Sequence, residues 1–255
     1  MLVPRRSATT IDDMSETTIA LVTGANKGIG YEIAAGLGAL GHRVGVGARD
    51  ARRREDAVAK LRAAGVDAFG VPLDVTDDAS VTDAADLINA REGRLDILVN
   101  NAGILSDVWP DAPSSTTPDM MRRVLETNVI GVVRVTNALL PLLRRAPRPR
   151  IVNQSSHLGS LGLQTAPGVD LGGASGAYSP SKTLLNAVTV QYAKELSTTT
   201  IKINIACPGY VATDFNAFEG TSTAAEGAAI AIRLATLPDD GPTGQMFDAT
   251  GPVPW

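Results

Sequence analysis

A tyrosine and a lysine lie four residues apart in the segment Y-S-P-S-K, at Tyr178 and Lys182. On a helix this spacing puts both side chains on one face. A nearby ammonium group favours phenolate, so we expect Lys182 to lower the pKa of Tyr178 from its usual value of about 10. A tyrosine with a lowered pKa is better suited to proton transfer at neutral pH. The pair alone occurs often by chance, so its interpretation depends on the rest of the chain.

A glycine-rich segment, T-G-A-N-K-G-I-G at residues 23–30, follows an apolar run and precedes a helical pattern. Gly24, Gly28 and Gly30 would let the backbone turn tightly and approach a pyrophosphate, which the N-terminus of the helix also attracts. The spacing differs from the common G-x-G-x-x-G, and glycine also serves simple turns. Its position after the first strand favours a dinucleotide site, and hence hydride transfer beside the proton transfer of Tyr178.

The end of the second predicted strand indicates which dinucleotide binds. An NAD site places an acidic residue there, on the ribose 2′-hydroxyl. Here Ala48 occupies that region and Arg49 follows it, although Asp50 is only one position further. The planar guanidinium group suits a 2′-phosphate, so Arg49 predicts NADP(H) as the cofactor, with Lys27 as a second positive group. We expect the arginines at 52–54 to form the solvated start of a helix.

Apolar runs typical of strands alternate with helical patterns along the chain. This alternation predicts an α/β Rossmann fold with a doubly wound, seven-stranded parallel sheet, in a single domain at 19–255. Residues 1–18 are polar and predicted to be a disordered extension, with Met14 as the native start. The predicted strands are 19–23, 43–48, 68–73, 95–100, 150–154, 201–206 and 245–248, and the predicted helices are 28–40, 51–64, 77–91, 118–143, 177–196 and 223–237.

The composition excludes several classes of protein. Hydrophobic residues make up 44% of the chain and charged residues 20%, as in soluble globular proteins. The net charge of -4 argues against binding to nucleic acid or anionic membranes. No apolar run is long enough to span a membrane. The single cysteine, Cys207, fits a cytoplasmic setting, and no Cys/His cluster predicts a metal site. A serine hydrolase is rejected, because Ser156 lacks a nucleophile elbow and neither histidine of the chain, His42 or His157, follows it at a distance.

These motifs, taken in order, resemble the short-chain dehydrogenase/reductase family over nearly the whole length of the chain. The matching segments are T-G-A-N-K-G-I-G, L-D-V at 73–75, N-N-A-G at 100–103, Asn128, I-V-N-Q-S-S at 151–156, Y-S-P-S-K and P-G-Y-V-A-T-D at 208–214. The N-K-G loop, the A-R-D strand end and the closing G-P-V-P-W are most similar to the carbonyl reductase branch.

The resemblance implies an NADPH-dependent reductase that converts a ketone or aldehyde to an alcohol, reversibly. Tyr178 would donate the proton, Ser156 would hold the carbonyl, Lys182 would bind the nicotinamide ribose, and Asn128 would support a water that leads to solvent. Asp74 would bind the adenine, or else form a turn before Thr76. The implied cofactor-binding residues are Gly24, Asn26, Lys27, Gly28, Ile29, Gly30, Arg49, Asp74, Val75, Asn101, Ala102, Gly103, Tyr178, Lys182, Pro208, Gly209, Val211 and Thr213.

The spacing between the predicted serine and the tyrosine departs from the family pattern. Ser156 and Tyr178 are 22 residues apart, more than is common in the family, and the surplus falls in residues 159–176. A loop absorbs such a surplus at little cost. Ser155 and Ser160 are the alternative serines, and the family register favours Ser156.

The substrate is expected to be a small apolar or aromatic carbonyl compound, in a pocket walled by residues 105–117, 158–177 and 215–221, with Trp109, Phe215 and Phe218 as candidate lining. The resemblance leaves a homodimer, a homotetramer and a monomer open. The alternative function is a catalytically silent NADP-binding sensor, which typically lacks the tyrosine or the lysine.

Overall fold

The computed structural model describes residues 17–107 and 111–255. The predicted extension at 1–18 therefore lies almost entirely outside the described residues, as do Met14 and Trp109. Thr17, near the start of the described chain, accepts a hydrogen bond on its carbonyl oxygen from Arg94 (3.1 Å).

The core of the molecule is one seven-stranded sheet in the order β3-β2-β1-β4-β5-β6-β7, and every neighbouring pair is parallel. The fold predicted from the alternating patterns is confirmed. The strands are β1 Ile19–Thr23, β2 Arg43–Ala48, β3 Ala68–Pro72, β4 Ile97–Asn100, β5 Arg150–Gln154, β6 Lys202–Ala206 and β7 Met246–Phe247.

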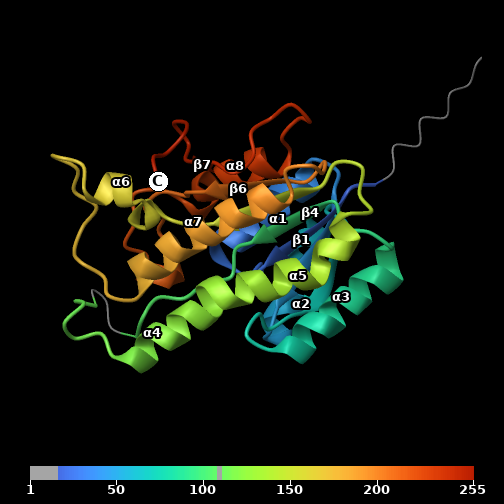
Figure 1. The fold of residues 1–255 in the computed structure, drawn as a ribbon. Coiled ribbons are helices and arrows are strands. Elements are labelled where there is room, and N and C mark those ends of the chain that lie inside the picture. The colour runs from blue at the N-terminus through green and yellow to red at the C-terminus, as the bar shows by residue number, and fades with distance from the viewer. Residues whose placement is uncertain (1–16, 108–110) are drawn as a thin grey trace, which may run out of the picture.

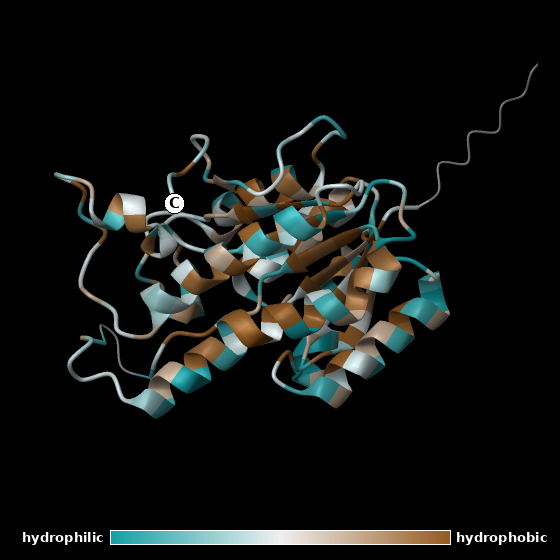
Figure 2. Ribbon diagram, in the orientation of Figure 1, coloured by the Kyte–Doolittle hydropathy of each residue, from teal (hydrophilic) through white to brown (hydrophobic). Residues whose placement is uncertain are grey.

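Helices cover both faces of the sheet (Figure 1). They are α1 Gly28–Ala39, α2 Ala51–Ala63, α3 Asp78–Glu92, α4 Pro118–Leu125, α5 Gly131–Leu143, α6 Leu161–Gln164, α7 Tyr178–Glu195 and α8 Ala224–Ala235. Helices α1, α2 and α8 pack on one face and form a core around Val22, Ile33 and Leu61. Helices α3, α5 and α7 pack on the other face, around Leu21, Leu98 and Leu139. Figure 2 shows the apolar strands enclosed between these layers.

The order of the strands reverses between β1 and β4. From β1 the chain builds outward through β2 and β3, then returns to the other side of β1 to add β4. In open α/β sheets the helices on the two sides of such a switch point diverge, and ligands bind beyond the carboxyl ends of the strands there. The topology thus places the ends of β1 and β4 at the expected site.

The long helix predicted for residues 118–143 contains an irregularity that the sequence pattern did not indicate. Helix α4 passes into a π-helical turn, Glu126–Ile130, before α5 begins. Such turns are rare and occur often at functional sites. This one contains the fully buried Asn128.

The region at 159–176, predicted to be a loop, contains the short helix α6 and is attached to the end of the chain. The Ser160 hydroxyl donates to the carbonyl oxygen of Pro254 (2.6 Å), and the Gly162 amide donates to that of Trp255 (2.5 Å). These bonds anchor the segment that follows Ser156.

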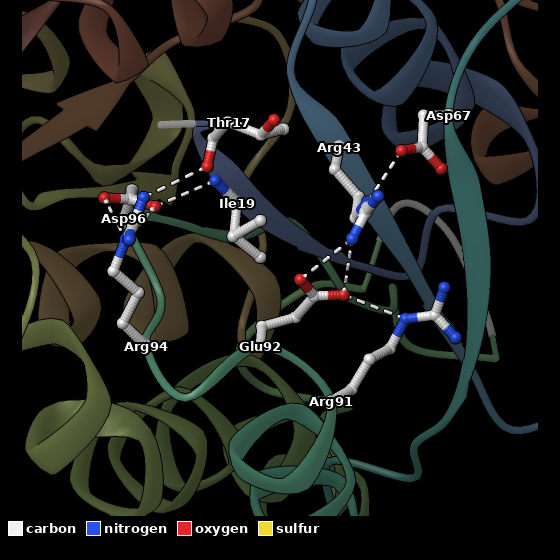
Figure 3. A network of polar contacts seen from close by, with 8 residues as sticks. All are labelled: Thr17, Ile19, Arg43, Asp67, Arg91, Glu92, Arg94 and Asp96. Atoms are coloured by element: carbon white, nitrogen blue, oxygen red, sulfur yellow. Dashed lines mark hydrogen bonds and ion pairs between the residues drawn. The ribbon is translucent and has the colours of Figure 1, made fainter. Parts of the chain in front are cut away.

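A network of charged residues joins the amino-terminal ends of the strands (Figure 3). The buried Asp96 carboxylate accepts from the amide of Ile19 (2.8 Å) and from the guanidinium group of Arg94 (3.2 Å). Arg43, at the start of β2, bonds to Asp67 (2.6 Å) and Glu92 (3.1 Å). The network thus ties β1, β2 and α3 together at the amino-terminal ends of the strands, opposite to the carboxyl ends where ligands are expected to bind.

Candidate active site

A cleft of about 420 Å³ opens at the carboxyl ends of the central strands. It is lined by all but one of the residues predicted to bind the cofactor or to carry the chemistry: Gly24, Asn26, Lys27, Gly28, Ile29, Gly30, Arg49, Asp74, Val75, Asn101, Ala102, Gly103, Ser156, Tyr178, Lys182, Pro208, Gly209, Val211 and Thr213. The exception, Asn128, is buried behind the wall of the cleft. Segments far apart in the sequence therefore meet at one site.

The glycine-rich loop is held tightly against the strand beside it. Gly24 has a φ of +65°, a conformation that favours glycine. A Cβ on Gly30 would lie 2.4 Å from the side-chain nitrogen of Asn101 and 2.5 Å from the carbonyl oxygen of Gly24, so no larger residue fits there. Helix α1 begins without a side-chain cap. The first backbone amide groups of α1 therefore have no side-chain cap and remain available to an anionic group in the cleft. A pyrophosphate is such a group.

Tyr178 is the first residue of α7 and is almost fully buried. The Ser156 side chain hydrogen-bonds to it, whereas the two alternative serines are engaged elsewhere. Ser155 donates to Asn186 on α7 (2.7 Å), and Ser160 is bonded to Pro254. The structure thus brings Ser156, and neither alternative, to the tyrosine.

Lys182 lies one turn along α7 from Tyr178, as the four-residue spacing predicted. Its ammonium nitrogen is 5.6 Å from the centre of the Tyr178 ring and donates to the carbonyl oxygen of Gln154 (2.8 Å). Burial lowers the pKa of Lys182 from 10.5 to about 8. The amine is thus held in place at the bottom of the cleft, and its pKa lies close to physiological pH.

The predicted direction of the Tyr178 pKa shift is wrong for the protein without a bound cofactor. Burial raises the pKa of Tyr178, and the hydrogen bond with Ser156 opposes that rise only in part. The sequence argument counted the charge of Lys182 but could not count desolvation, which disfavours the phenolate. At neutral pH the tyrosine is a phenol, which is the form that donates a proton.

The lowered pKa of Lys182 predicts an unusual dependence of stability on pH. Below pH 8 the folded protein is destabilised by a buried ammonium group, and this cost disappears as the amine loses its proton between pH 8 and 10.5. Relative to a Lys182→Met variant, the free energy of unfolding of the wild type should therefore rise by about 2 to 3 kcal/mol between pH 7 and pH 10.

Urea denaturation over this pH range measures the difference. The raised pKa of Tyr178 lowers the free energy of unfolding only above pH 10.0, the ordinary pKa of a tyrosine. Tyr178 is present in both proteins that are compared. Lys194→Met, a change at an exposed lysine of the same helix, is the control and should show no such slope. A difference that stays constant with pH would contradict the prediction.

Asn128 fixes the backbone beside the cleft. Its side-chain oxygen accepts from the Ile104 amide (2.8 Å), and its nitrogen donates to the Ile104 carbonyl oxygen (3.0 Å) and the Ser181 hydroxyl (3.0 Å). A Cβ on Gly103 would lie 3.3 Å from the Asn128 oxygen and 3.8 Å from the Lys182 nitrogen. Asn128 thus lies next to Lys182, where its predicted role requires it to be.

The far end of the cleft, where the adenosine ribose is expected, is lined by two arginines and two aspartates, Arg49, Arg53, Asp50 and Asp74. Arg49 is largely exposed, and its guanidinium group is 4.0 Å from the Asp74 carboxylate. The other oxygen of Asp74 accepts from the amide (3.0 Å) and hydroxyl (2.7 Å) of Thr76, so the turn that the sequence left as an alternative is present. Burial acts to raise the pKa of Asp74, but the Thr76 hydrogen bonds and the charge of Arg49 outweigh it and lower that pKa.

Lys27 lines the cleft but forms an ion pair with Asp214, across from the glycine-rich loop. Asp50 caps α2 by accepting from the Arg53 amide (2.9 Å), which accounts for an acid so close to the 2′-hydroxyl position.

The prediction that the arginines at 52–54 are all solvated is wrong for Arg54. This side chain is buried, and it donates to the carbonyl oxygen of Ala48, the last residue of β2 (3.0 Å). Arg53 is exposed but lines the cleft, so it is a second cation beside Arg49. Its position in the first turn of the helix that follows β2 was the signal in the sequence.

Several further cleft residues were not predicted from the sequence. They include Gln154 and Tyr210. Of the aromatic candidates that were predicted, Phe215 lines the cleft and packs edge-on against Tyr178, with ring centres 5.8 Å apart. Phe218 is exposed and does not line the cleft. His157 bonds to Asp248 (2.9 Å) rather than to Ser156.

Two other features of the described residues bear on function. No group of His, Cys, Asp or Glu side chains within 17–107 and 111–255 is arranged to hold a metal ion. In the same part of the chain, no helix has the length and apolar character needed to cross a bilayer.

Comparison with known proteins places the chain in a family. The family model described as short chain dehydrogenase matches residues 18–223. Salutaridine reductase of Papaver bracteatum is 35% identical over 91% of this chain and 94% of its own length, and (+)-neomenthol dehydrogenase of Capsicum annuum is 31% identical over 91% and 96%. An NADPH-bound carbonyl reductase from chicken fatty liver superposes with a TM-score of 0.82 at 29% identity, over 94% of this chain and 99% of that one. The chain is therefore an oxidoreductase that belongs to the short-chain dehydrogenase family.

Proposed function

We propose that this protein is an NADPH-dependent reductase that converts a ketone or aldehyde to an alcohol, in a reversible reaction. The observation that carries the proposal is the cluster of Tyr178, Ser156 and Lys182 at the base of a cleft whose other end presents Arg49 and Arg53. The relatives support it, since they are named as a reductase of salutaridine, a dehydrogenase of neomenthol and a carbonyl reductase that binds NADPH.

The residues present fit this cofactor at both ends. The uncapped start of α1 and the close approach at Gly30 suit the pyrophosphate, and the exposed guanidinium groups of Arg49 and Arg53 suit a 2′-phosphate. Lys27 would join them on exchanging Asp214 for the phosphate. Lys182 and the segment Pro208–Thr213 would hold the ribose and nicotinamide, as the family resemblance implies.

When bound, the cofactor supplies a hydride to the carbonyl carbon. The protein supplies the proton. Tyr178 donates its hydroxyl hydrogen to the carbonyl oxygen as the C=O bond becomes a C–O single bond, and Ser156 orients that oxygen. Lys182 then stabilises the phenolate that forms, because an ammonium group beside it favours the charged form. Asn128 holds the backbone next to Lys182, where a water leading to solvent would restore the proton.

The walls of the cleft near Tyr178 favour an apolar or aromatic carbonyl compound. Leu105, Leu158, Tyr210 and Phe215 all line it there. A second, smaller cavity of about 160 Å³ shares Leu158 and is lined by Gln164, Asp170, Ser175 and other residues of the loop before Tyr178. The substrate we propose therefore has an apolar ring next to its carbonyl group, and the second cavity has room for a polar substituent on it.

A screen of NADPH oxidation at 340 nm across aliphatic aldehydes, sugars, quinones, aryl ketones and ring ketones tests the proposal. We expect turnover with ring and aryl ketones, and kcat/KM at least tenfold lower for sugars. Tight NADPH binding with no turnover across the panel would refute the proposal and favour the silent sensor, which no feature of the described residues supports.

A further inference from the structure

Gln154 carries an amide group that the folded chain leaves unpaired. Among the described residues, four buried side-chain atoms have no hydrogen-bond partner, and two of them are the nitrogen and oxygen of this one side chain. Buried polar groups are normally paired, since leaving one without a partner costs free energy. An amide with neither group satisfied therefore needs a reason.

The position of Gln154 suggests the reason. It is the last residue of β5, pairs with Ala206 on β6 and is only 6% exposed, yet it lines the cleft. Its own carbonyl oxygen holds the ammonium group of Lys182 (2.8 Å). The backbone of Gln154 thus lies against Lys182, and the residue that carries the unpaired amide lines the same cleft.

The neighbours of Gln154 on the strand show that its environment is special. Asn153 donates to Thr189 (2.8 Å) and Ser155 donates to Asn186 (2.7 Å), both on α7. Side chains alternate along a strand, so Gln154 points to the other face, away from the partners on α7. The polar side chains on either side are satisfied by the protein, and only Gln154 is not.

A primary amide offers donors on its nitrogen and an acceptor on its oxygen. Its best complement is another primary amide, which satisfies both groups at once. We propose that the side chain of Gln154 binds the nicotinamide end of the cofactor by pairing with its carboxamide. This inference rests on the proposed function, because it requires the nicotinamide to lie beside Lys182 and Tyr178.

Replacement of Gln154 by Met, which has a similar length and no polar donor, tests the pairing. The apoprotein should become more stable, with Tm higher by about 2–4 °C, because an unpaired amide is removed. The Kd for NADPH, measured by fluorescence titration, should rise about 5- to 10-fold, as expected for lost hydrogen bonds to the ligand. A residue with a purely structural role would not give this opposite pair of effects.

Two controls make the test specific. ADP-ribose 2′-phosphate contains every part of NADP except the nicotinamide. It should bind to the wild type and to Gln154→Met with equal affinity. Asn204→Leu removes a buried amide that is paired with Pro242 and Gln245, at residues that do not line the cleft. It should lower Tm and leave the Kd for NADPH unchanged.

The proposal is overturned if Gln154→Met binds NADPH as tightly as the wild type, even when the KM for the carbonyl compound rises, since that would assign the amide to the substrate. A destabilised or unfolded variant would also overturn it, by showing that the amide is paired within the apoprotein. A wild-type protein that fails to bind NADPH at all would instead refute the proposed function.

Discussion

Replacing Tyr178 by phenylalanine is expected to lower kcat/KM for carbonyl reduction by about 10³-fold, the usual order for loss of a positioned general acid. The phenylalanine ring keeps the edge-on contact with Phe215 and the position over which Lys182 lies, so only the hydroxyl is lost. The Kd for NADPH should change by no more than about twofold. Steady-state kinetics and fluorescence titration measure the two quantities.

Tyr192→Phe is the matched control on the same helix. Its hydroxyl is bonded to Asn137 (2.7 Å), away from the cleft, so its loss should affect stability slightly and turnover not at all. Near wild-type turnover in Tyr178→Phe would show that the proton comes from another group and that the assignment of the general acid is wrong.

The double variant Ala48→Asp, Arg49→Leu should shift the ratio of kcat/KM for NADPH to that for NADH by about 100-fold toward NADH. The wild type offers the exposed guanidinium groups of Arg49, which follows β2, and of Arg53, in the first turn of α2. Hydrogen bonds to charged groups contribute about 1.5–3 kcal/mol each, so removing one cation and adding one anion is sufficient for this change.

Arg52→Leu is the control, because Arg52 is exposed and does not line the cleft. Its cofactor preference should equal that of the wild type. Should the wild type itself prefer NADH, the assignment of the 2′-phosphate to Arg49 would fail. Retained NADPH preference in the double variant would transfer the role to Arg53 and Lys27.

Patterns that depend on local geometry were predictable from the sequence. The alternation of apolar runs and helical patterns gave every strand to within two residues at each end. The four-residue spacing was enough to place Tyr178 and Lys182 on one face of α7, and the glycine-rich segment was correctly located after β1.

Features that depend on which groups are buried together were not predictable. The pattern of arginines at 52–54 shows three equal charges, but Gly70 on β3 leaves room for Arg54 alone to fold under the helix. The pKa of Tyr178 depends on desolvation, which arises only when the folded chain buries its hydroxyl, and the hydrogen bond with Ser156 opposes it only in part. Gln154 has the same status, since in the sequence nothing distinguishes it from Asn153, the polar residue next to it, whose side chain is paired in the folded protein.

The π-helical turn at Glu126–Ile130 makes the site sensitive to chain length as well as to residue type. A π-turn holds one residue more than an α-helical turn. Deleting any one of its five residues would allow a continuous α-helix and so preserve local structure. It would keep α4 and α5 in nearly the same orientation about the helix axis, since the π-turn and the α-turn that replaces it each complete about one revolution, but it would displace the residues within the turn itself. Asn128 could then no longer hold both backbone groups of Ile104. Insertions and deletions in this helix should therefore be tolerated far less well than substitutions at its exposed positions.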